Sequence, residues 1–147
     1  GGRLMASKRE EILQALFGAL TAISGPRVSR NDPLPERVPA TGAIILRDGD
    51  PGEPDVLLSP PEWVYAHRAE IEVVVDRATP PERDAVFDGL MIAIGNAIAA
   101  DRTLGGLCDW VEAEAPAPID VVVEGAPGLK AAVVPVVLHY GTADPLS

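Results

Sequence analysis

The first pattern along the chain is a stripe of apolar residues at helical spacing near the N-terminus, with Ile12 and Leu16 at its centre. Such a stripe is typical of a helix that buries one face. Ser7 and Glu10 stand just before it in the S-x-x-E spacing of a capping box, in which each side chain bonds a backbone N–H at the helix start. The sequence therefore predicts a helix over residues 8–23.

A second stripe at helical spacing includes Phe87, Leu90 and Ile94. The run T-P-P-E at 79–82 precedes it and forms another capping box. Proline stands at the first helical position, where its missing N–H has no intrahelical partner to lose. We therefore expect a longer helix over residues 80–100.

Between the two predicted helices, the stretch 65–75 alternates between two faces. One face carries His67, Ile71 and Val73, among other residues suited to a core. The opposite face carries three charged residues, Arg68, Glu70 and Glu72. This alternation predicts a long strand of an antiparallel sheet, with one buried face and one face in contact with solvent.

Shorter apolar runs bounded by turn-forming residues predict the remaining strands, at 43–47, 56–58, 110–115, 119–124 and 129–140. The segments 24–40 and 48–54 are rich in proline or glycine and predict an extended connector and a long loop. Pro135 lies inside the last predicted strand and has no N–H. We therefore expect it at an edge position, at a bulge, or where the N–H direction faces away from a neighbour.

This order of elements predicts an α+β fold, with an antiparallel or mixed sheet of about 4–6 strands and two helices packed on one face. The length of 147 residues favours a single domain, taken as residues 5–147. Residues 1–4 precede Met5 and are interpreted as a remnant of cloning. Apolar residues make up 47% of the chain and aromatic residues only 4%, so we expect an aliphatic core.

The formal net charge of −10 narrows the range of partners. It disfavours a nucleic-acid backbone or an anionic membrane as the main ligand, because like charges repel. It is compatible with DNA that passes along an acidic wall without binding to it. No apolar run approaches the roughly 18–20 residues that span a bilayer. We therefore expect a protein that is made and kept in the cytosol.

The candidates for acid–base chemistry are His67 and His139, which lie in strands that could bring them together. We interpret both as structural or solvated histidines, because no zinc-ligand spacing, phosphate loop or nucleophile elbow accompanies them. Cys108 is the only cysteine, and its apolar neighbours predict a buried packing residue. The sequence thus predicts no catalytic residue, no metal and no cofactor.

After the capped first helix, three strings follow in order: YAHRAEIEVVVDR at 65–77, TPPERDAVFDGLMIAIGNAIAAD at 79–101 and GLKAAVVPVVLHYGT at 128–142. This order resembles the tail terminator family of long-tailed phages, of the lambda type, and related prophage and gene-transfer-agent tail proteins. The resemblance extends from Ser7 to Thr142 and includes H-R-x-x-[IV]-x-[IV]-x-V at 67–75. Residues 109–124 are longer than the family pattern.

The resemblance implies a structural minor tail protein and not an enzyme. Six copies would form a ring that caps the tail tube, ends its polymerisation and contributes to head–tail joining. The implied partners are copies of the chain, the tail tube protein and head–tail connector proteins, with DNA passing through the ring. The implied location is the host cytoplasm before assembly and the virion tail afterwards.

A ring needs a heterologous interface, made of two different patches on each subunit. We expect one patch to combine the charged face of the long strand with the acidic turn before it: Asp48, Asp50, Glu53, Arg68, Glu70 and Glu72. We expect the other patch on the connector: Arg27, Arg30 and Arg37. The alternative functions are another head–tail connector or tail completion protein, and a small cytosolic enzyme or ligand-binding domain.

Overall fold

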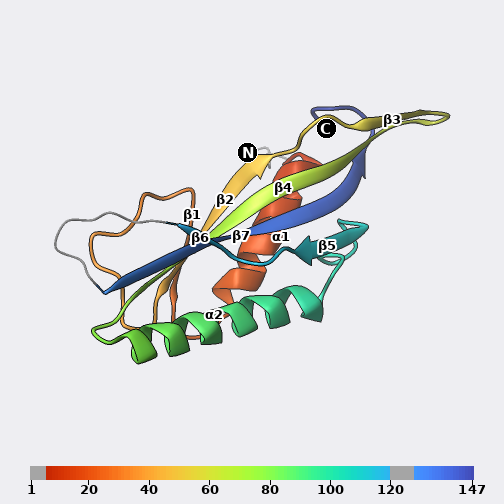
Figure 1. Ribbon diagram of the computed structural model, residues 1–147. Coiled ribbons are helices and arrows are strands. Elements are labelled where there is room, and N and C mark those ends of the chain that lie inside the picture. The colour runs from red at the N-terminus through yellow and green to blue at the C-terminus, as the bar shows by residue number, and fades with distance from the viewer. Residues whose placement is uncertain (1–5, 120–127) are drawn as a thin grey trace, which may run out of the picture.

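The computed structural model describes residues 6–119 and 128–147, and it has the predicted α+β architecture (Figure 1). Its elements in chain order are α1 (Lys8–Thr21), β1 (Arg27–Arg30), β2 (Ala43–Asp50), β3 (Asp55–Leu58), β4 (Pro61–Asp76), α2 (Pro80–Ala100), β5 (Trp110–Ala113), β6 (Ala117–Ile119) and β7 (Leu129–Thr142). Both predicted helices form, and α2 has the predicted bounds, while α1 ends two residues earlier than expected. The predicted strand at 119–124 lies mostly outside the described residues.

The sheet has seven strands, in the order β1-β2-β4-β7-β5, with β3 added on β4 and β6 on β7. It is mixed, because β1 pairs parallel to β2 and all other pairs in the described ranges are antiparallel. The expectation of about 4–6 strands was too low. The difference comes from β1, which lies in the segment predicted as connector. Its partner β2 is distant in sequence, and no local pattern reveals that pairing.

The centre of the sheet is the pair β4–β7, whose register runs from Trp63 opposite Thr142 to Asp76 opposite Leu129. Pro135 therefore lies in a central strand, so the edge position, one of its three expected placements, is wrong. Its carbonyl oxygen accepts a hydrogen bond from the Glu114 backbone N–H at 2.8 Å. A strand residue directs its N and its C=O to the same side, so the missing N–H of Pro135 faces the interruption between β5 and β6.

The predicted loop at 48–54 begins as strand, because β2 continues to Asp50. The register of β2 with β4 shifts between Arg47 and Asp50, which marks a β-bulge. Gly49 lies in this bulge with φ +71° and packs directly over the backbone of β4. The acidic residues at the end of β2 are therefore held by the sheet.

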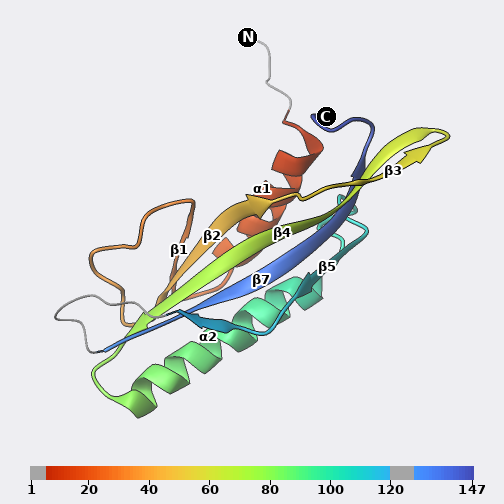
Figure 2. The same cartoon turned by 45° about the horizontal axis from the view of Figure 1, so that its top comes forward.

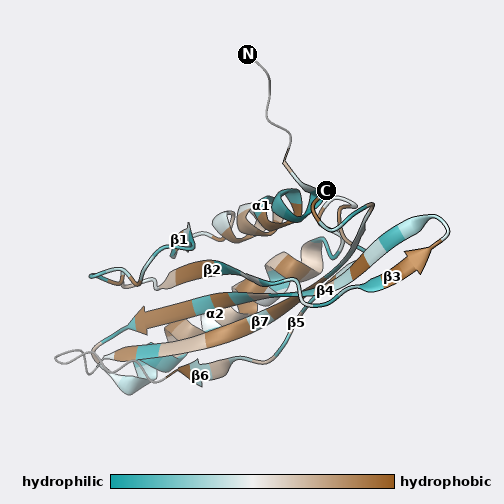
Figure 3. Ribbon diagram, turned by 90° about the horizontal axis from the view of Figure 1, so that it is seen from above, coloured by the Kyte–Doolittle hydropathy of each residue, from teal (hydrophilic) through white to brown (hydrophobic). Residues whose placement is uncertain are grey.

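The core lies between one face of the sheet and both helices, whose buried residues join a single apolar cluster. From α1 it includes Ile12 and Leu16, and from α2 it includes Leu90 and Ile94. Cys108 is buried in the same cluster as predicted, and burial raises the pKa of its thiol to about 11. Figure 3 shows the apolar residues along the central strands, and also on β3, which lies at the far end of the sheet.

Candidate interaction surfaces

Two of the predicted interface residues, Arg30 and Asp48, form an ion pair with each other inside the chain. The Arg30 side chain, from β1, donates to Glu10 of α1 and to Asp48 of β2, with Nη2–Oε1 and Nε–Oδ1 distances of 2.7 and 2.8 Å. These hydrogen bonds lower the pKa of both carboxyl groups and raise that of the guanidinium. Arg30 and Asp48 thus fasten α1 to the sheet.

Replacing Arg30 with methionine should lower the free energy of unfolding by roughly 2 kcal/mol at neutral pH, because several charge-assisted hydrogen bonds are lost. The folded-state pKa values of Glu10 and Asp48 lie below their unfolded values. Their contribution is therefore complete above the unfolded pKa values and is lost as the pH falls through the folded ones. Urea denaturation measures the change. Arg68→Met, which removes an exposed pair, is the control and should have a much smaller effect.

The charged face of β4 lies on the side of the sheet away from the helices. Arg68 pairs with Glu114, with an Nη1–Oε1 distance of 2.9 Å, and Glu72 pairs with Arg47 at 3.2 Å. Glu70 is exposed between them. These pairs reach solvent, so they contribute little to stability, and this face offers ordered charges of both signs to a partner.

The remaining predicted residues lie at two places. Arg27 and Arg37 line the same shallow depression, formed by the start of β1 and the segment that follows it. Asp50 and Glu53 are exposed near the end of β2, where the Asp50 side chain accepts a hydrogen bond from the Gly52 backbone N–H at 2.8 Å. The structure therefore brings the two exposed connector arginines together, and it separates both from Arg30.

His67 is buried, and its ring forms part of a chain of hydrogen bonds in which each donor and acceptor can be assigned. Its Nε2 lies 2.6 Å from the Asp48 carbonyl oxygen, and its Nδ1 lies 2.8 Å from the Tyr140 hydroxyl. A carbonyl can only accept, so Nε2 carries the proton and Nδ1 accepts from Tyr140. The Tyr140 oxygen accepts in turn from Arg9 Nε at 2.8 Å. The chain thus connects α1 to β7, β4 and β2.

The surroundings of His67 favour the neutral imidazole. Burial lowers its pKa, and the nearby Arg9 adds to this effect, although the bond to the Asp48 carbonyl opposes it. His139 lies on the opposite face of the sheet, where its Nε2 is 3.2 Å from Glu112 Oε1. The two histidines therefore do not approach one another as the sequence had suggested.

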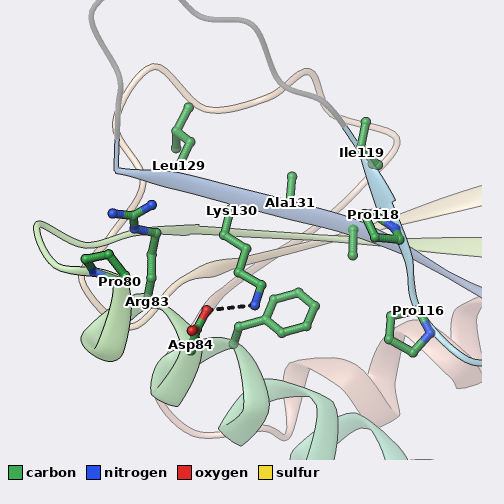
Figure 4. A pocket seen from close by; sticks show the side chains of 11 residues that line it. Pro80, Arg83, Asp84, Pro116, Pro118, Ile119, Leu129, Lys130 and Ala131 are labelled. Atoms are coloured by element: carbon green, nitrogen blue, oxygen red, sulfur yellow. Dashed lines mark hydrogen bonds and ion pairs between the residues drawn. The ribbon is translucent and has the colours of Figure 1, made fainter.

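A cavity of about 600 Å³ lies between the start of α2 and the strands β6 and β7 (Figure 4). Its wall includes Phe87, Pro116 and Pro118. Lys130 Nζ lies 2.9 Å from Asp84 Oδ1 and 4.5 Å from the centre of the Phe87 ring. The cavity is thus an apolar groove beside an internal ion pair, and neither histidine lines it.

The strand β3 exposes apolar side chains to solvent. The sequence predicted this strand, but it did not predict that the strand would form an exposed interaction surface. The strand pairs with the first four residues of β4, and we call this unit, residues 55–64, the hairpin arm. Val56, Leu57 and Leu58 are 49%, 53% and 82% exposed. Figures 1 and 2 show the arm projecting past the end of the sheet. Three successive apolar residues between turn formers were the signal available in the sequence.

Among the residues at 6–119 and 128–147, no group of His, Cys, Asp and Glu side chains is placed to hold a metal ion. Neither α1 nor α2 is long and apolar enough to cross a membrane. No protein-family model matches the chain, and no curated protein matches it. The hairpin arm and the charged outer face are therefore the features on which a functional proposal can rest.

Proposed function

We propose that this chain is a structural assembly protein, which forms a ring with copies of itself and caps a phage-type tail tube. The observation that carries the proposal is the hairpin arm. A strand pair that exposes three successive apolar side chains is a feature of surfaces that dock, since scattered apolar residues are common on a protein but contiguous ones are not. The ring would contain six copies, as the resemblance to tail terminators implies.

The arm also fits the geometry that a ring demands. It lies at one end of the molecule and reaches out to a different surface on the next copy, which would make the contact heterologous. Such heterologous contacts continue from copy to copy until the ring closes. The tail tube protein and head–tail connector proteins are the proposed neighbours above and below the ring. The net charge of −10 suits a bore through which DNA passes without binding.

Size-exclusion chromatography with light scattering tests this function, on the purified chain alone at rising concentration and with the tail tube protein of the same genome. We expect a particle of six copies, at high concentration or on the tube, and tubes that stop growing once it is added. Leu58→Asp should weaken assembly about 10-fold or more, because it places a charge in a docking surface. Leu146→Asp is a matched control, since Leu146 is 86% exposed and lies outside the arm.

A chain that stays monomeric under both conditions and leaves tube length unchanged would rule out the ring. Equal effects of Leu58→Asp and Leu146→Asp would show that assembly does not use the arm. Turnover of a small molecule, lost on replacing His67, would instead support the alternative of a small enzyme.

A further inference from the structure

The groove between the start of α2 and the strands β6 and β7 combines an apolar wall with positive charge (Figure 4). Its charged lining residues are Arg83, Asp84 and Lys130. Because Asp84 pairs with Lys130, Arg83 gives this lining a net positive charge, in a chain whose formal net charge is −10. The rest of the wall is mainly an aromatic ring, prolines and aliphatic side chains: Pro80, Phe87, Pro116, Pro118, Ile119 and Leu129.

The Arg83 guanidinium keeps most of its hydrogen-bonding capacity for a partner. Its Nε donates to the Arg77 carbonyl oxygen at 3.2 Å, the one hydrogen bond that this side chain makes within residues 6–119 and 128–147. A guanidinium has five N–H donors in a planar fork that matches a carboxylate. Figure 4 shows Arg83 beside Pro80 at one end of the groove. An acidic side chain that enters the groove with an apolar segment would therefore find a donor there.

We infer that the hairpin arm of one copy seats in this groove of the next copy, an inference that rests on the proposed ring. The arm exposes three successive apolar side chains, at 56–58, which match the apolar wall in character. Asp55 begins the same strand and is exposed as well, so the arm presents a carboxylate directly beside its apolar residues. In the seated arm, the aliphatic side chains would pack on Phe87 and the neighbouring prolines, and Asp55 would accept hydrogen bonds from Arg83.

Charge complementarity argues for a second copy as the occupant. The net charge of −10 makes two copies repel one another in general, so a stable contact between them needs a place where the charges attract. The arm carries a formal charge of −2, because residues 55–64 include Asp55 and Glu62 and no basic residue. The groove lining carries +1. The two surfaces thus match in charge and in apolar character, and such a match selects a partner and fixes its register.

The arm and the groove lie at opposite ends of the molecule. The β4–β7 register starts with Trp63, beside the arm, and ends with Asp76, opposite the groove residue Leu129. These paired strands separate the two sites by about 40 Å, at roughly 3.3 Å per residue. The arm therefore cannot fill the groove of its own copy (Figures 1 and 2). Each bound pair leaves one free arm and one free groove, as growth of a ring requires.

A charge exchange between copies tests the inference. Arg83→Glu places a negative charge in the groove, and Asp55→Lys places a positive charge on the arm. Size-exclusion chromatography with light scattering measures assembly, at the concentration or on the tube where the native chain forms rings. We expect each variant alone to assemble about 10-fold more weakly, because like charges then face each other at every contact.

Mixing the two variants should restore assembly to within about threefold of the native chain. In the mixture, the two altered surfaces attract one another, and the remaining contacts join an unaltered arm to an unaltered groove. The two kinds of copy would alternate around a ring of six, which is an even number. A folding defect caused by either substitution would not be repaired by mixing, so restoration separates a contact from a structural role.

Arg37→Glu is the matched control, because it makes the same charge change on an exposed arginine outside the groove. Mixed with Asp55→Lys, it should assemble several-fold more weakly than the exchanged pair does, since the altered arm then meets an unaltered, positive groove. Equal restoration by Arg37→Glu and Arg83→Glu would overturn the assignment of the groove.

Disulfide cross-linking gives a second measurement that leaves Arg83 in place. Leu58→Cys on one preparation should cross-link to Pro118→Cys on another under mild oxidation, since a seated arm brings the Cα atoms within the roughly 7 Å that a disulfide allows. Ala99→Cys, exposed on α2 away from the groove, should cross-link several-fold less. Cys108 stays in place, because it is buried and its thiol has a pKa of about 11.

The outcomes separate the two proposals. If native rings form but the exchanged pair is not restored and Leu58→Cys does not prefer Pro118→Cys, the groove is not the receptor and the ring proposal stands. If the native chain forms no ring, on or off the tube, both proposals fail.

Discussion

Replacing Gly49 with alanine should lower the free energy of unfolding by about 3 kcal/mol, the sum of a strained backbone and a steric clash. Gly49 has φ +71°, which residues with a Cβ adopt only at a cost. An added Cβ would lie 2.8 Å from the Ala69 Cα and closer still to the Arg68 carbonyl oxygen. Both atoms belong to the backbone of β4 in the middle of the sheet, so they cannot move aside cheaply.

Gly52→Ala is the matched control for this prediction. Gly52 has nearly the same φ, +69°, but an added Cβ there meets no atom within 4 Å. It should therefore show only the backbone penalty, about 1 kcal/mol. Urea denaturation of both variants measures the difference. Equal losses in the two variants would mean that β4 does not restrict the bulge.

Acidification should destabilise the protein through His67, by up to about 1.4 kcal/mol for each pH unit below the unfolded pKa of histidine, about 6.5. The folded-state pKa of His67 is lowered by burial, so the unfolded chain binds the proton more readily. Stability therefore falls as the pH decreases from the unfolded pKa towards the folded one, and the loss is complete below the folded pKa. Protonation also removes the Nδ1 acceptor that Tyr140 uses.

Replacing His67 with leucine should abolish this part of the pH dependence, while lowering stability at neutral pH by roughly 2 kcal/mol because Asp48 and Tyr140 each lose a buried partner. The measurement is the urea midpoint between neutral and mildly acidic pH. His139→Gln, on the exposed side of the sheet, should keep the pH dependence of the native chain. If the His67→Leu variant keeps the same pH dependence of stability, His67 is not the source of that dependence.

Much of the fold could be predicted because its signals are local. The N-cap of α1 forms as expected, with the Ser7 hydroxyl accepting from the Glu10 N–H at 3.2 Å. The alternation in β4 likewise predicted its buried and solvent-facing residues from Tyr65 to Val73, but Val74, expected on the solvent-facing side, is buried. In contrast, β1 depends on a parallel partner 16 residues further along the chain. It has only four residues, in a proline-rich segment, and these form no local pattern that predicts a strand.

The candidate site was less predictable, because it depends on how the strands end. Arg30 and Asp48 lie in segments that turn formers mark as solvated, and only the tertiary fold places Arg30 against both Asp48 and Glu10. The hairpin arm is exposed because β4 begins at Pro61 and β3 lies beside its start, whereas the pairing with β7 ends at Trp63 opposite Thr142. The exposure of the arm depends on the lengths of the neighbouring strands relative to one another. The hydrophobic pattern of one strand does not reveal these relative lengths.

The central position of β7 has a consequence for biosynthesis. The strand that completes the middle of the sheet, β7, is synthesised after the other strands that the structure describes, and its partner β4 ends more than fifty residues earlier in the chain. Until Leu129–Thr142 emerges, the backbone N–H and C=O groups on one side of β4 lack their partner strand, and this edge stays exposed in the nascent chain. Such distant pairing slows folding. We therefore expect the sheet to complete its folding only after β7 has emerged, and the chain to need chaperone protection until then.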